Sequence, residues 1–201
     1  MNRSTRLFTV IIGVVTGFTG SIHGLFEVMQ GNRPTGGFVM GMIGAVTFVQ
    51  NYLVTGVLAM AAGTAVVCHS LFFIHRKHGV PVYLLLCAVL FLCGGGVACL
   101  SGIILGAYTA SRIGQPLNGW GKILPSNLQR LLAGLWIYIL AAGFLFLGIG
   151  IAIWLFILPP GKIHHIDTVQ IACWASLLSG LFLLLLSIIA GFARDISQKI
   201  K

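Results

Sequence analysis

Hydrophobic residues run in long blocks along this chain, and short polar connections separate the blocks. Five of the blocks are long enough for a transmembrane helix, which needs about 20 apolar residues to cross the hydrocarbon core. They cover residues 7–29, 52–74, 81–110, 131–158 and 168–192. The pattern predicts an all-α integral membrane bundle of five transmembrane helices, with residues 1–201 forming a single membrane domain. Blocks 81–110 and 131–158 exceed the core thickness, so we expect them to tilt or to project into the interface.

A shorter apolar stretch, residues 38–49, lies between the first two blocks. As a helix it would rise only about 18 Å, which is too short to cross a bilayer. Because backbone groups at membrane depth must still be hydrogen-bonded, we expect a re-entrant or interfacial half-helix here. A six-span alternative would divide residues 38–74 into two helices, with Gln50 and Asn51 as the only polar break.

The first block resembles a secretory signal, because a basic start precedes an apolar run. The run continues to residue 29, which is too long for the hydrophobic region of a signal peptide, and no clear cleavage site follows it. We therefore expect it to be the first transmembrane helix.

Composition supports the membrane assignment. Hydrophobic residues make up 58% of the chain, charged residues make up 7%, and the mean hydropathy is +1.02, whereas a soluble domain carries about a quarter charged residues. The formal charge of +9 is expected at helix ends beside anionic membrane lipid. Because no more than two basic residues are adjacent, nucleic acid is not an expected partner. We expect the plasma membrane as the location.

The basic residues do not orient a five-helix arrangement. Five of them would share the side of the N-terminus: Arg3, Arg6, Arg76, Lys77 and Lys162. Seven would lie on the other side: Arg33, Arg112, Lys122, Arg130, Arg194, Lys199 and Lys201. Cytoplasmic loops usually carry the excess of Lys and Arg. The N-terminal charges favour one orientation and the total favours the other, so the rule gives no decision.

Glu27 is the most unusual residue in the apolar blocks, because intramembrane ionisable groups are costly and frequently functional. His23 lies four residues earlier, so the two side chains share one helix face. Together they could form a site for a proton, a small solute or a lipid-like molecule. The other polar residues expected at this site are Gln30, Asn32, Arg33, Gln50 and Asn51. The alternative is that Glu27 pairs with His23 or Arg33 and only fixes helix packing.

Haem and metal cofactors are not expected. His23 and His69 should lie at different depths in antiparallel helices, so they do not form an axial pair. His75, His78, His164 and His165 fall in two connections that could meet, and they are weak candidates for metal ligands. The five cysteines lie in apolar runs without a CxxC pair, as expected for small packing residues.

The run CGGGVAC, residues 93–99, falls within the third block. Three consecutive glycines weaken a helix but allow another backbone or a ligand to approach closely. Close helix packing is the ordinary explanation, and an unwound substrate site like that of a broken transporter helix is the alternative.

No motif of a soluble enzyme is present, and only three acidic residues are available for catalysis. We therefore do not expect an enzyme. The favoured hypothesis is a small multi-pass protein that binds or translocates its solute near His23 and Glu27. The alternative is an accessory subunit that packs against itself or against other membrane subunits.

Overall fold

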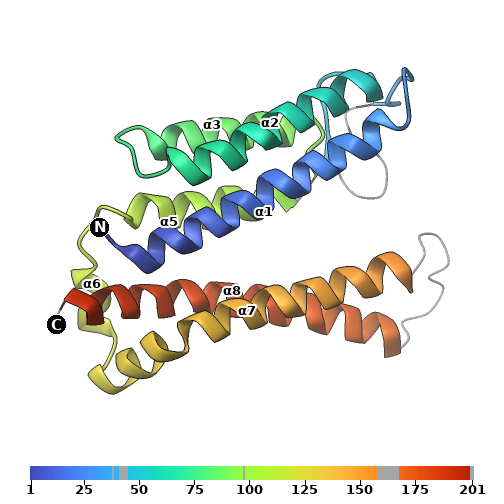
Figure 1. Cartoon of the computed structure of the whole chain (residues 1–201). Coiled ribbons are helices and arrows are strands. Elements are labelled where there is room, and N and C mark those ends of the chain that lie inside the picture. The colour runs from blue at the N-terminus through green and yellow to red at the C-terminus, as the bar shows by residue number, and fades with distance from the viewer. Residues whose placement is uncertain (38, 41–44, 97, 158–167, 200–201) are drawn as a thin grey trace. The chain divides into compact units, whose positions relative to one another are not determined.

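The computed structural model describes all residues except 38, 41–44, 97, 158–167 and 200–201. It is 80% helical, which confirms the all-α prediction. Within the described residues, four helices are long and apolar enough to cross a membrane. They are α1 (Arg3–Val28), α2 (Tyr52–Phe72), α7 (Ser126–Phe156) and α8 (Thr168–Lys199), shown in Figure 1.

The chain forms two compact units, Met1–Pro116 and Leu117–Lys201. The first contains α1, α2 and the segment that follows α2, and the second contains α7 and α8. Each unit is described by itself below. That they act as a single membrane domain stays a prediction.

The third apolar block, 81–110, does not form one continuous helix, and this part of the five-helix prediction is wrong. It contains α3 (Gly79–Leu92), a break after Leu92, and then a second helical run of α4 (Ala98–Ser101), the π-helical segment η1 (Gly102–Gly106) and α5 (Ala107–Arg112). At about 1.5 Å per residue, the 14 residues of α3 rise about 21 Å, short of the roughly 30 Å hydrocarbon core.

The two arms run antiparallel and form a helical hairpin. The Tyr83 hydroxyl in α3 donates a 3.0 Å hydrogen bond to the Gly102 carbonyl, and the ring fits where Gly106 has no side chain. At the end of the hairpin, the Asn2 amide side chain donates to the Arg112 carbonyl at 2.7 Å. The second arm therefore returns to the end of the unit where α1 begins (Figure 1).

Helices α1 and α2 pack closely through glycines. A Cβ added at Gly17 would lie 2.5 Å from the Gly63 carbonyl oxygen, and one at Gly24 would lie 2.6 Å from the Gly56 carbonyl oxygen. Only glycine allows the two backbones to approach so closely, as in small-residue interfaces of membrane helices. The glycines of the first block therefore serve helix contact.

The expected half-helix over residues 38–49 is also wrong for the described part of that range. β1 (Val39–Met40) and β2 (Ala45–Val46) pair as antiparallel strands, while residues 38 and 41–44 lie outside the described residues. Thr47 continues the pairing in a bridge to Cys93. The described backbone groups of this segment are thus paired between the two strands and with the hairpin break rather than within a helix.

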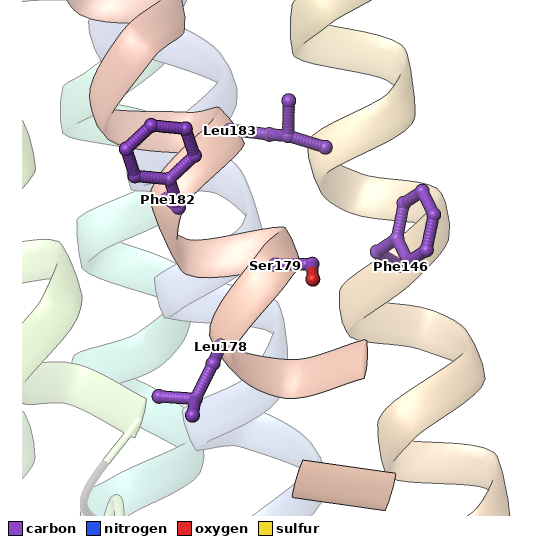
Figure 2. A pocket seen from close by; sticks show the side chains of 5 residues that line it. All are labelled: Phe146, Leu178, Ser179, Phe182 and Leu183. Carbon is purple, nitrogen blue, oxygen red and sulfur yellow. The ribbon is translucent and has the colours of Figure 1, made fainter. Parts of the chain in front are cut away.

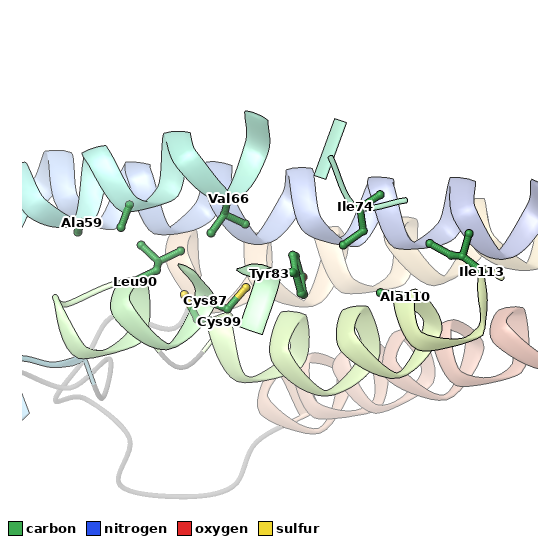
Figure 3. Close-up of a cluster of buried hydrophobic side chains, with 10 residues drawn as sticks. Ala59, Val66, Ile74, Tyr83, Cys87, Leu90, Cys99, Ala110 and Ile113 are labelled. Atoms are coloured by element: carbon green, nitrogen blue, oxygen red, sulfur yellow. The ribbon is translucent and has the colours of Figure 1, made fainter. Parts of the chain in front are cut away.

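A buried cluster holds the first unit together and lies where α1, α2 and both hairpin arms meet. Figure 3 shows it around the fully buried Tyr83 ring. Its members are Ala59, Ala62, Val66, Ile74, Tyr83, Cys87, Leu90, Cys99, Ala110 and Ile113. All five cysteines of the chain are free thiols, and Cys87 and Cys99 are packing members of this cluster.

The second unit is an antiparallel pair of long helices, α7 and α8, with the short α6 (Asn118–Ile123) packed on α8. The Trp120 ring lies 5.5 Å from the Phe192 ring and fixes α6 there. An open apolar groove lies along the pair, and Figure 2 shows the five side chains that line it. They are Phe146, Leu178, Ser179, Phe182 and Leu183.

Candidate functional site

His23 and Glu27 lie on the face of α1 that meets the break in the helical hairpin. A Cβ at Gly96 would lie 2.9 Å from Nε2 of His23, and one at Gly94 would lie 2.7 Å from Oε2 of Glu27. Both glycines have positive φ angles, +92° at Gly94 and +76° at Gly96, which residues with a side chain rarely adopt. The glycine turn therefore brings bare backbone against the only His–Glu pair of α1.

Glu27 is buried at this contact. Its side chain is 5% exposed, and Oε2 has no hydrogen-bond partner in the described part of the chain. Buried polar groups are nearly always paired, so a carboxyl oxygen without a partner calls for a bound proton, ion or solute. His23 is half-buried on the preceding turn. Glu27 is therefore enclosed, whereas His23 is partly open to the surroundings.

A hydrogen-bonded network from β2 and α2 anchors the glycine turn. The hydroxyl oxygens of Thr47 and Thr55 lie 2.6 Å apart, and Thr55 donates at 2.8 Å to the Cys93 carbonyl. The Gly94 amide donates at 2.9 Å to the Val46 carbonyl. Strand β2 and helix α2 therefore fix the turn that faces Glu27.

Three of the other expected site residues meet at the start of α2. Asn51 caps the helix by accepting a hydrogen bond from the Val54 amide, and its side-chain amide donates at 2.6 Å to Asn32. The Arg33 carbonyl accepts from the Tyr52 amide at 2.9 Å. Asn51 and Asn32 therefore tie the start of α2 to the connection that follows α1.

Gln30, Gln50 and the Arg33 side chain are exposed. No contact from these three side chains to Glu27 is seen in the described part of the chain. That they close the site stays a prediction.

The remaining histidines are placed apart from this site. His69 is buried near the opposite end of α2, where Nε2 lies 2.8 Å from the Gly79 carbonyl oxygen. His75 and His78 are exposed in the turn between α2 and α3, while His164 and His165 lie outside the described residues. Among the described residues, no three His, Cys, Asp or Glu side chains are grouped to hold a metal.

Sequence reasoning missed Thr47 and Thr55 as parts of the site. It noted the glycine run of residues 93–99 but did not connect it with Glu27. The only local signal was the run of three glycines, which is typical of both a close helix contact and a break. The pairing of Thr47 with Cys93 links residues far apart in sequence, and no spacing rule reveals such a contact.

Comparison with known proteins gives no relative from which a role can be transferred. No protein-family model, curated protein or solved structure matches this chain significantly.

Proposed function

We propose that this protein binds a proton or a small solute at Glu27 and His23 and moves it across the plasma membrane. The observation that carries the proposal is the Glu27 carboxyl group, since the residue is 5% exposed and its Oε2 has no hydrogen-bond partner among the described residues. A charge in such surroundings loses its hydration without compensation. Proton binding neutralises the group, and proton release restores a charge that attracts a cation or a polar solute.

The glycine turn supports transport rather than simple packing. In broken transporter helices, unwound backbone gives carbonyl groups to a solute near the middle of the protein. Here the turn between the hairpin arms places Gly94 and Gly96 against Glu27 and His23 without intervening side chains. A small solute that entered between the glycine turn and α1 could therefore contact the backbone of the turn and the Glu27 carboxyl group together.

His23 gives the buried carboxyl a neighbour that can exchange protons. It lies one helical turn from Glu27 and is half-buried. Neutral imidazole accepts a proton on one nitrogen while the other nitrogen can release one. We therefore assign His23 the role of passing protons between Glu27 and the surroundings.

The test is a proton-flux assay on purified protein in liposomes that contain a pH-sensitive dye. A potassium diffusion potential, set with valinomycin, drives protons through any conducting protein. We expect Glu27→Gln, which keeps the shape of the side chain, to reduce the flux at least tenfold. Gln115→Ala is the control, since Gln115 is an exposed residue of the same unit, at the end far from Glu27.

Two results contradict the proposal. A Glu27→Gln protein with unchanged flux would remove Glu27 from the pathway. A wild-type protein with no flux above that of empty liposomes would overturn proton transport and favour the alternative of an accessory subunit. Size-exclusion chromatography and thermal unfolding of each variant separate loss of flux from loss of fold.

A further inference from the structure

The helical hairpin changes which basic residues share an end of the first unit. Because the chain reverses between α3 and α4, α5 ends beside the start of α1, where the Asn2 amide donates to the Ile113 carbonyl at 2.9 Å. The turn between α2 and α3 lies at the same end (Figure 1). Five basic residues therefore gather there: Arg3, Arg6, Arg76, Lys77 and Arg112. In the described part of this unit, Arg33 alone lies at the opposite end.

The second unit, taken by itself, also gathers basic residues at one end. Helices α7 and α8 are antiparallel, because Gly143 packs on Leu184 and Gly150 packs on Leu177. The start of α7 and the end of α8 therefore share one end. Among the described residues, four basic residues belong to this end: Lys122, Arg130, Arg194 and Lys199. Lys162 belongs to the connection between the helices, outside the described residues.

We call the end of each unit that carries these residues its basic end. We propose that the basic end of each unit faces the cytoplasm and binds anionic phospholipid headgroups. Cytoplasmic segments carry the excess of Lys and Arg, and the cytoplasmic leaflet carries anionic lipid. This assignment replaces the undecided orientation of a five-helix arrangement.

Aromatic rings support the headgroup position of the basic end. The Arg112 guanidinium lies 5.5 Å from the centre of the Tyr108 ring, and the Arg194 guanidinium lies 5.2 Å from the Trp136 ring. Tyr and Trp are enriched where membrane helices meet headgroups, and long basic side chains extend from there to phosphate groups. In the first unit, the exposed Tyr108 and Arg112 side chains thus provide both kinds of interfacial anchor, whereas Trp136 of the second unit is buried. Glu27, near the other end of α1, faces the opposite side of the membrane.

Orientation is tested with a membrane-impermeant maleimide on cells that express the full chain. Lys77→Cys reports on the basic end and Gln50→Cys reports on the opposite end, because both positions are exposed. We expect Gln50→Cys to be labelled in intact cells and Lys77→Cys only after permeabilisation. The wild-type chain measures the background of its own thiols. The reverse labelling pattern would overturn the proposal.

Lipid binding is tested by thermal unfolding of the purified protein in vesicles of phosphatidylcholine with or without phosphatidylglycerol. We expect phosphatidylglycerol to raise the unfolding midpoint, and Arg76→Gln/Lys77→Gln to reduce that rise while Arg33→Gln leaves it unchanged. The rise should also shrink at high salt. Equal midpoints in the two lipid mixtures, an equal effect of Arg33→Gln, or the same rise with inorganic phosphate would each overturn the lipid assignment.

Discussion

The carboxyl group of Glu27 occupies the space that a side chain at residue 94 would need. A Cβ at Gly94 would lie 2.7 Å from Oε2 and 2.9 Å from the Cδ of Glu27. The same glycine has a φ of +92°. Two independent constraints, backbone conformation and the position of Glu27, therefore require glycine here, and they can be separated by mutation.

Gly94→Ala should destabilise the protein. The positive φ alone costs about 1–3 kcal/mol for a residue with a side chain, and the contact with Glu27 adds to this cost. The expected result is a lower midpoint in thermal or denaturant unfolding of the purified protein. If Glu27 transports protons, flux should fall as well, because the carboxyl group must move.

Gly36→Ala is the control for the backbone part of this effect. Gly36 has a φ of +74°, and no atom lies within 4 Å of an added Cβ. The Gly36→Ala variant should therefore lose stability through backbone strain alone. The double variant Glu27→Ala/Gly94→Ala should recover the part of the Gly94→Ala loss that is due to the carboxyl contact. Strict additivity of the two single losses would show that the contact has no energetic role.

Thr55→Val should loosen the glycine turn without changing the shape of the side chain. Thr55 is fully buried and its hydroxyl bonds both Thr47 and the Cys93 carbonyl. Its removal leaves the carbonyl without this donor, at a cost of about 1–3 kcal/mol. Hydrogen exchange of the Gly94 amide should accelerate. Thr64→Val is the matched control, because Thr64 is exposed and bonds only within its own helix, and equal effects of the two variants would contradict the prediction.

The long helices could be predicted because each apolar block is long enough to cross a bilayer. The hairpin could not, because residues 81–110 contain no charged residue, Ser101 and Thr109 lie within the second arm, and the glycine run 94–96 is typical of a close helix contact as well as of a turn. In a membrane, core-facing and lipid-facing side chains are equally apolar, so periodicity does not separate two short helices from one long helix. The break is visible only in the positive φ angles of Gly94 and Gly96.

The site was predictable to the extent that it is local. Four-residue spacing places His23 and Glu27 on one helix face, and the structure agrees. Their contact with Gly94 and Gly96 depends on the fold of a segment about 70 residues later. The pairing of β1 with β2 and of Thr47 with Cys93 is equally non-local. Taken by itself, a short apolar segment such as residues 38–49 is compatible with either a helix or a strand, and the segment that it pairs with decides which of the two forms.

Asn51→Ala should weaken the start of α2. The side chain accepts a hydrogen bond from the Val54 amide at 3.2 Å and donates one to Asn32 at 2.6 Å. Loss of such a cap costs about 0.5–2 kcal/mol. The expected result is a lower unfolding midpoint and faster hydrogen exchange in the first turn of α2. Gln50→Ala, at the exposed neighbouring position, should change neither measurement, and a midpoint shift as large as that of Asn51→Ala would assign the effect to the connection instead of the cap.

Gly17→Leu should separate α1 from α2. A Cβ at Gly17 would already lie 2.5 Å from the Gly63 carbonyl oxygen and 2.8 Å from Cγ2 of Val67, so a larger side chain has no space. Overpacking of a filled interior costs about 1–3 kcal/mol or more, so we expect a lower unfolding midpoint and a reduced yield of folded protein. Gly148→Leu is the control, because Gly148 lies in helix α7 with open space around an added Cβ. A Gly17→Leu protein as stable as Gly148→Leu would show that the close α1–α2 contact is absent in the membrane.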